Sequence, residues 1–173
     1  MGAMPRGGVV TVGSGADSLR LVTGPRISLT IDCADPARLV PFWCEVLGYV
    51  PEPPPGGHGS WLAYWRSLGF PEAELAGVDD STSDSIVDPS GARPRIWFQA
   101  VPEPKSAKNR LHIDVDLTQA RSLPLAERKA IVDRESQRLA LLGARPVRVL
   151  DPPGADYYAI VMTDPEGNEF CLA

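Results

Sequence analysis

The sequence predicts an α+β protein built from two tandem βαβββ modules. Two observations carry this prediction. A strand pattern followed by a helix pattern occurs twice along the chain, and each half contains the turn sequence Asp-Pro-x-Gly. The aspartates of these turns, Asp88 and Asp164, are 76 residues apart (164 − 88). A duplicated module explains this spacing better than one irregular sheet, although in a chain with 18 prolines the turns alone do not exclude chance.

The first half begins with a strand pattern and continues with a helix pattern. Residues 27–33 (ISLTIDC) alternate apolar and polar side chains, as a half-buried strand does. The polar positions of this strand are Ser28, Thr30 and Asp32. Residues 34–49 (ADPARLVPFWCEVLGY) predict a helix, because Asp35 suits the N-cap, Pro36 the first turn and Gly48 the C-terminal end.

The second half repeats this order. Residues 110–117 (RLHIDVDL) alternate in the same way, so Arg110, His112 and Asp114 share one face of a predicted strand. Residues 123–144 then carry apolar side chains at helical spacing, and a glycine near the end of this segment closes the predicted helix. A strand, a helix and a closing glycine therefore recur in the same order in the second half of the chain.

These patterns divide the chain into one domain and a tail. We expect an N-terminal tail at 1–25 and a domain at 26–173, made of a first module (about 26–101), a linker (102–109) and a second module (about 110–173). Two segments rich in Pro, Gly, Ser and Asp, 51–60 and 67–85, read as loops. The second is long enough to act as a flap or an interaction element.

The composition excludes several classes of protein. The net charge is −5 and the basic residues do not cluster, so nucleic acid is not an expected partner, and an anionic ligand would need a local basic site. No apolar run approaches the roughly 20 residues of a membrane span. The three cysteines form an odd set without C-x-x-C spacing, which argues against a disulfide framework and a structural zinc site and favours the cytoplasm.

Three segments resemble a known superfamily. They are IDCADPARLVPFWCEVLGY at 31–49, RIWFQAVPEPKSAKNRLHIDVD at 95–116 and VMTDPEGNEFCL at 161–172. The chain resembles the vicinal oxygen chelate superfamily, and within it the glyoxalase-like domain proteins of actinobacterial type. The resemblance implies a curled mixed sheet that forms a half-barrel around a cavity, with helices outside, and a homodimer. Because the superfamily includes glyoxalases, dioxygenases and antibiotic-sequestering proteins, it leaves the reaction open.

Under this resemblance, the polar face of each strand lines the cavity. The candidate catalytic residues are then His112, Asp114 and Glu169. The candidate ligand-binding residues are Ser28, Thr30, Asp32, Trp97, Gln99, Arg110 and Cys171. Polar side chains on the solvent-exposed face of an ordinary sheet would need no such explanation. The cavity is therefore implied by the resemblance and not by the strand pattern.

The resemblance also implies where a metal would bind in this fold. The ligand positions of metal-dependent members fall on Ser28, Gln99, Arg110 and Cys171. Arginine only donates hydrogen bonds and glutamine is a weak neutral ligand, so we expect no metal cofactor there. A displaced divalent metal site remains an alternative, with His112 and Glu169 as ligands and Asp114, Asp32 or Cys171 completing it.

These residues favour a metal-independent isomerase or lyase. His112 would move a proton while Asp114 or Glu169 orients the imidazole, and Arg110 would bind a carboxylate, phosphate or enolate oxygen. Alternatively, His112, Thr30 and Asp114 only satisfy one another in a polar interior. Cys171 could be a nucleophile beside Arg110, but a cysteine in a C-terminal strand is usually a packing residue.

Two further functions stay open. One is a non-catalytic protein that sequesters a flat small molecule, similar to bleomycin resistance proteins. Its cleft would be lined by aromatic residues: Trp61, Trp65, Trp97, Tyr157 and Tyr158. The other is a metal-dependent glyoxalase or dioxygenase with the displaced site described above. All three functions imply a small-molecule ligand.

Overall fold

The computed structural model describes residues 26–78, 80, 83–118 and 123–173, so the predicted tail lies outside the described residues. The first module contains β1 (Ser28–Cys33), α1 (Pro36–Leu47), β2 (Val50–Pro51), β3 (Ser85–Val87) and β4 (Arg95–Ala100). Its β2–β3 connection contains η1 (Pro55–Gly57), α2 (Trp61–Ser67) and α3 (Glu72–Leu75). The second module contains β5 (Ile113–Val115), α4 (Leu125–Leu141), β6 (Arg145–Leu150), β7 (Ala159–Thr163) and β8 (Glu169–Leu172).

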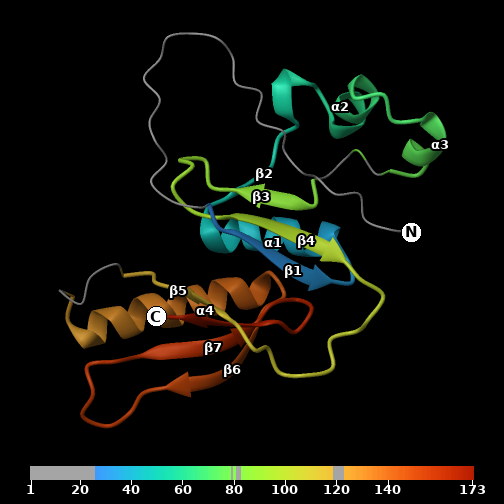
Figure 1. Ribbon diagram of the computed structural model, residues 1–173. Helices are drawn as coiled ribbons and strands as arrows, with labels where there is room; N and C mark the ends of the chain where they lie inside the picture. Colours follow the sequence, from blue (N-terminus) through green and yellow to red (C-terminus); the bar gives the residue numbers. More distant parts are fainter. Residues whose placement is uncertain (1–25, 79, 81–82, 119–122) are drawn as a thin grey trace.

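The two modules have the same sheet topology. The first sheet has the order β1-β4-β3-β2 and the second the order β5-β8-β7-β6. In each, the first and last strands of the module are parallel neighbours and the remaining pairs are antiparallel. Helices lie alongside both sheets, and neither sheet closes into a barrel (Figure 1). The predicted tandem βαβββ architecture is confirmed.

Local signals place the ends of the first helix. The Asp35 side chain accepts a hydrogen bond from the backbone N–H of Ala37, and Pro36 begins α1 as predicted. Gly48 follows α1 with φ 63°, a left-handed conformation that glycine adopts without strain. Helix α4 of the second module is shorter than the predicted segment 123–144, because Pro124 takes an extended conformation at its N-cap.

One hydrophobic core joins the two modules. Trp43 of α1 is 1% exposed, and its ring centroid lies 5.3 Å from that of Phe170 in β8. Its indole Nε1 also donates to Asp164 Oδ2 at 3.3 Å, in the Asp-Pro-x-Gly turn of the second module. Glu166 of the same turn accepts hydrogen bonds from the backbone N–H groups of Ala34 and Asp35. The modules are therefore fixed to each other by α1 and its entry segment.

Two segments differ from the sequence prediction. The strand expected at 110–117 is limited to Ile113–Val115, because β5 is an edge strand and its one partner, β8, begins only at Glu169. Leu111, expected on the apolar face, is exposed in a bend before the strand. Part of the predicted loop 67–85 is helical, and α2 and α3 pack on each other around a small aromatic core of their own.

Among the described helices, none has the length and apolar character that a membrane crossing requires.

Candidate functional site

His112 and Asp114 form a pair at the edge of the second sheet. His112 Nε2 lies 3.2 Å from Asp114 Oδ1, and the two side chains are 45% and 71% exposed. With its proton on Nε2, the imidazole donates to the carboxylate and keeps a lone pair on Nδ1. The pair is thus oriented as a general base requires, and it is open to a ligand from solvent.

Cys171 lies directly beside this pair. It is the register partner of Asp114 in the parallel β5–β8 ladder and is 7% exposed. Burial raises the pKa of the Cys171 thiol, and the neighbouring Asp114 raises it further through its charge and by accepting the thiol hydrogen bond. A thiol held protonated in this way is a poor nucleophile, which supports the packing interpretation of Cys171.

Glu169 shares this face but has a different partner. Its carboxylate Oε2 lies 3.6 Å from Lys108 Nζ, and its backbone N–H donates to Asn109 Oδ1 at 3.3 Å. The end of the predicted linker therefore lies against the start of β8. Of the two carboxylates expected to orient His112, Asp114 is the one within hydrogen-bonding distance.

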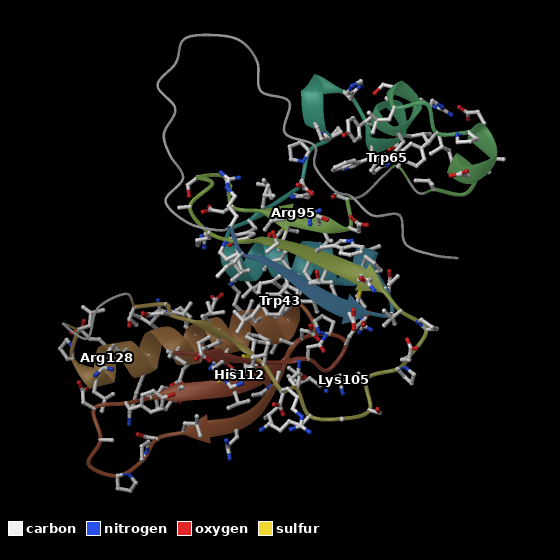
Figure 2. All side chains as sticks on the ribbon, in the orientation of Figure 1. Trp43, Trp65, Arg95, Lys105, His112 and Arg128 are labelled. Atoms are coloured by element: carbon white, nitrogen blue, oxygen red, sulfur yellow. The ribbon has the colours of Figure 1, made fainter. Side chains whose placement is uncertain are left out.

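The remaining candidates lie on the first sheet. Ser28, Thr30 and Asp32 are exposed along β1, while Trp97 and Gln99 are half-buried on β4. The register places Thr30 beside Trp97 and Asp32 beside Gln99, as expected for one shared face. Figure 2 shows His112 on the second module, Arg95 on the first and Trp43 between them. The predicted residues thus form two groups on two sheets, and Arg110 lies in the bend before β5.

The family's metal positions are a poor match for an ion. Ser28 and Gln99 offer neutral oxygens from the first sheet, and Arg110 offers only donors from an exposed bend. A different set has suitable chemistry: the imidazole nitrogen, carboxylate oxygen and sulfur of His112, Asp114 and Cys171 all lie within 4.8 Å of one another. These donor types fit a zinc-like divalent ion. Within the described residues, Glu169 is not part of this group.

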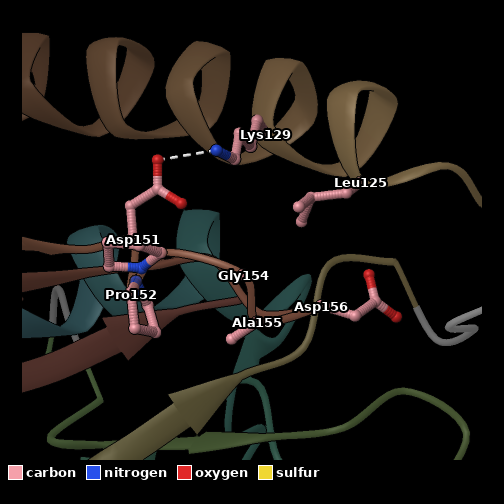
Figure 3. A pocket seen from close by; sticks show the side chains of 8 residues that line it. Leu125, Lys129, Asp151, Pro152, Gly154, Ala155 and Asp156 are labelled. Carbon is pink, nitrogen blue, oxygen red and sulfur yellow. Dashed lines mark hydrogen bonds and ion pairs between the residues drawn. The ribbon is translucent and has the colours of Figure 1, made fainter.

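Two surface pockets lie away from the His112 pair. One of about 610 Å³ lies between the start of α4 and the loop 151–156, where Lys129 Nζ is 2.6 Å from Asp151 Oδ2 (Figure 3). None of the predicted site residues lines it. The other, of about 600 Å³, lies at the end of the first sheet and includes Ser28 and Arg95 among its lining residues.

The sequence analysis missed two arginines on the open face of the second sheet. Arg145 and Arg148 of β6 align with Thr163 and Val161 of β7, which in turn align with Glu169 and Cys171 of β8. Regular alternation would place residues 145 and 148 on opposite faces, so no sequence periodicity could have identified them as a pair.

The comparisons with known proteins agree with this architecture. Residues 28–173 match the family model described as Glyoxalase-like domain. Among curated proteins, none matches the chain significantly.

Solved structures of the same fold share little sequence with the chain. A glyoxalase/bleomycin resistance protein/dioxygenase family enzyme from Burkholderia phytofirmans has 14% identity and a TM-score of 0.50, covering 84% of this chain and 94% of its own. The fosfomycin resistance protein FosX from Listeria monocytogenes has 11% identity and a TM-score of 0.52, covering 86% and 91%. A FosX mutant from that organism, complexed with Mn(II) and 1S,2S-dihydroxypropylphosphonic acid, has 13% identity and a TM-score of 0.50, covering 88% and 90%. The chain therefore belongs to the glyoxalase-like domain family.

Proposed function

We propose that the protein is a small-molecule isomerase or lyase that uses His112 for proton transfer without a metal. The observation that carries this proposal is the His112–Asp114 pair, whose 3.2 Å contact fixes the imidazole on an open face. The poor donor set at the family's metal positions supports chemistry that relies on side chains alone.

In this mechanism His112 acts on a carbon next to a carbonyl group. Nδ1 takes the proton, the C–H bonding pair moves into the carbonyl to form an enolate, and Asp114 stabilises the imidazolium that results. Arg110, two residues before His112, binds the enolate oxygen. The imidazolium then returns the proton to another carbon in an isomerisation, or to a leaving group in an elimination.

The proposal includes the state and location of the protein. We propose a homodimer, in which a second copy would shield the open face from water. Cys33, Cys44 and Cys171 are free thiols, which is consistent with the reducing cytoplasm proposed for the protein.

The direct test is hydrogen–deuterium exchange at carbon. The protein would be incubated in D₂O with a panel of small aldehydes, ketones and hydroxy acids, and loss of the proton signal next to the carbonyl would be followed by NMR. We expect exchange with at least one compound, a loss of about 100-fold in His112→Gln and a smaller loss of about tenfold in Asp114→Asn.

His58→Gln provides the matched control, because it makes the same substitution at the other histidine of the chain, which lies after η1 in the β2–β3 connection and not on the second sheet. It should exchange at the wild-type rate. Exchange that persists in His112→Gln would refute the proposal. Stoichiometric binding of a compound that never exchanges would instead support the sequestering function.

A metal-dependent reaction is a second candidate, favoured by the close grouping of His112, Asp114 and Cys171. These side chains would hold a zinc-like ion, and the bound ion would supply a Lewis acid. Elemental analysis of protein purified without chelator tests this function. Near-stoichiometric metal that is lost in His112→Ala and Cys171→Ser but kept in Glu169→Gln would establish it and overturn the metal-independent mechanism.

A further inference from the structure

The open face of the second sheet is organised in two rows that cross the strands. One row runs through the register partners Asp114, Cys171, Val161 and Arg148. The neighbouring row runs through Glu169, Thr163 and Arg145. His112 is two residues before Asp114, at the β5 edge, and both rows end in an arginine on β6. The proton-transfer pair and the arginines therefore lie at opposite edges of one surface.

A β-bulge brings the two arginines to the same face. Side chains in a strand alternate, so residues three apart normally point in opposite directions. Here the register shifts between Pro146 and Arg148, and Arg148 aligns with Val161 while Arg145 aligns with Thr163. Since Val161 and Thr163 are two residues apart on β7, the arginines share their face. Re-aiming a side chain in this way is a common role of bulges near binding sites.

No carboxylate of the described residues neutralises Arg145 or Arg148. Within the described residues neither has an ion pair, and both are exposed. The corresponding surface of the first sheet differs: Arg95 Nη2 lies 2.7 Å from Glu52 Oε2, and it also donates to Ser85 Oγ. In a chain of net charge −5, two unneutralised guanidinium groups in adjacent rows form the local basic site that an anionic ligand needs.

The separation of the two edges suits a small organic molecule. Three strand spacings of about 4.8 Å separate β5 from β6, giving about 14 Å between the backbones. An arginine side chain spans several ångströms of this distance. An arginine side chain together with an acid of short carbon chain is long enough to bridge these two edges.

We propose that Arg145 and Arg148 bind the anionic group of the substrate, a carboxylate or a phosphoryl group, and so hold its reacting carbon over His112. Guanidinium groups suit this task because they bind both oxygens of such a group in a planar, bidentate arrangement. The anion site stands on the sheet geometry alone, and the placement of the reacting carbon rests on the proposed proton-transfer function.

The test measures anion binding directly. Butyrate, propylphosphonate and the neutral butyramide would be titrated into ¹⁵N-labelled protein, and backbone amide shifts would be followed by NMR. We expect both anions to shift amides of β6, β7 and β8, while butyramide does not. The anion that binds more tightly identifies the class of substrate headgroup.

Arginine variants connect this binding to the two side chains. Arg148→Gln should weaken anion binding about tenfold, and the Arg145→Gln/Arg148→Gln double variant should abolish it. Arg134→Gln is the matched control, because Arg134 is an exposed arginine of α4 and its loss should change nothing. Circular dichroism would establish that each variant is folded. Equal binding of butyrate and butyramide, or wild-type affinity in the double variant, would overturn the proposal.

A His112→Gln variant separates this inference from the proposed function. It should bind both anions with wild-type affinity and lose carbon exchange. Arginine-dependent anion binding without exchange by the wild type would leave the site in place and refute the proton-transfer function. Exchange that depends on His112 but is unaffected by loss of both arginines would support the proton-transfer function and refute the role of the arginines in holding the substrate.

Discussion

The two modules share a topology but differ in the charges on their open faces. On the first sheet, Arg95 is neutralised by Glu52 and bonded to Ser85. On the second, Arg145 and Arg148 have no ion pair within the described residues, and His112 is held by Asp114. Arg95 lies on β4, the counterpart of β8, whereas Arg145 and Arg148 lie on β6, the counterpart of β2, so the two sheets carry their arginines on different strands. The charges on the two open faces therefore differ although the modules share one topology.

The equivalent turns show the same divergence. Asp88 is bonded within its own module, to Ser90 and Arg93. Asp164 receives hydrogen bonds from its own turn and also from Trp43 of the other module. The first aspartate closes a turn, whereas the second also connects the modules.

The largest loss of stability should come from removing Trp43, which connects the two modules. Trp43→Ala deletes a fully buried side chain that packs on Phe170 and bonds Asp164, so the free energy of unfolding should fall by about 4 kcal/mol. Trp65→Ala, in the separate aromatic cluster of α2 and α3, should cost clearly less. Urea denaturation measures both. Equal losses would show that the core between the modules is not the principal one.

A smaller loss of stability is expected when the buried turn of the second module loses the charge of Asp164. Asp164 is 2% exposed, and each of its carboxylate oxygens accepts two hydrogen bonds. In Asp164→Asn, the side-chain NH₂ group replaces one carboxylate oxygen and faces the two donors that this oxygen accepted from. This loss should lower the free energy of unfolding by about 2 kcal/mol. Asp88→Asn should cost less, because all the donors to Asp88 lie in its own turn, whereas Asp164 also accepts a hydrogen bond from Trp43 of the other module. Thermal denaturation of the two variants would rank them, and the opposite order would contradict this account.

The Asp88 turn should show its contribution in acid. Hydrogen bonds from the Arg93 guanidinium and the Ser90 hydroxyl hold the pKa of the Asp88 carboxyl well below its usual range. A carboxyl with a depressed pKa stabilises the folded state above its unfolded pKa of about 4, and this contribution is lost as the pH falls below that value. The stability gap between wild type and Asp88→Asn should therefore be larger at pH 7 than at pH 2.5. A gap that stays constant with pH would show that the charge of Asp88 contributes nothing.

The smallest effect should come from making the first sheet resemble the second. Glu52→Gln removes the carboxylate that neutralises Arg95, and since the pair is only partly buried, stability should change by about 0.5 kcal/mol. The freed guanidinium should then give the first sheet weak affinity for propylphosphonate, visible as new amide shifts in β4. If no shifts arise in this variant, an unpaired arginine on such a sheet is not sufficient to bind an anion.

The sequence by itself determined the repeated architecture and the limits of the first helix. Alternation along β1 and the capping residues of α1 are local signals, readable because each depends on neighbours a few positions away. The same alternation predicted that His112 and Asp114 share one face, and the structure places His112 just before β5 and Asp114 within it.

Only the tertiary structure decided which groups meet across strands. It paired Glu169 with Lys108 rather than with His112, placed Cys171 beside Asp114, and divided the predicted site residues between two sheets. It also inserted the bulge that turns Arg148 toward the face of Arg145. These contacts depend on strand register and on a local break in alternation. Both are set by packing between segments far apart in the chain, so no periodicity within one segment could reveal them.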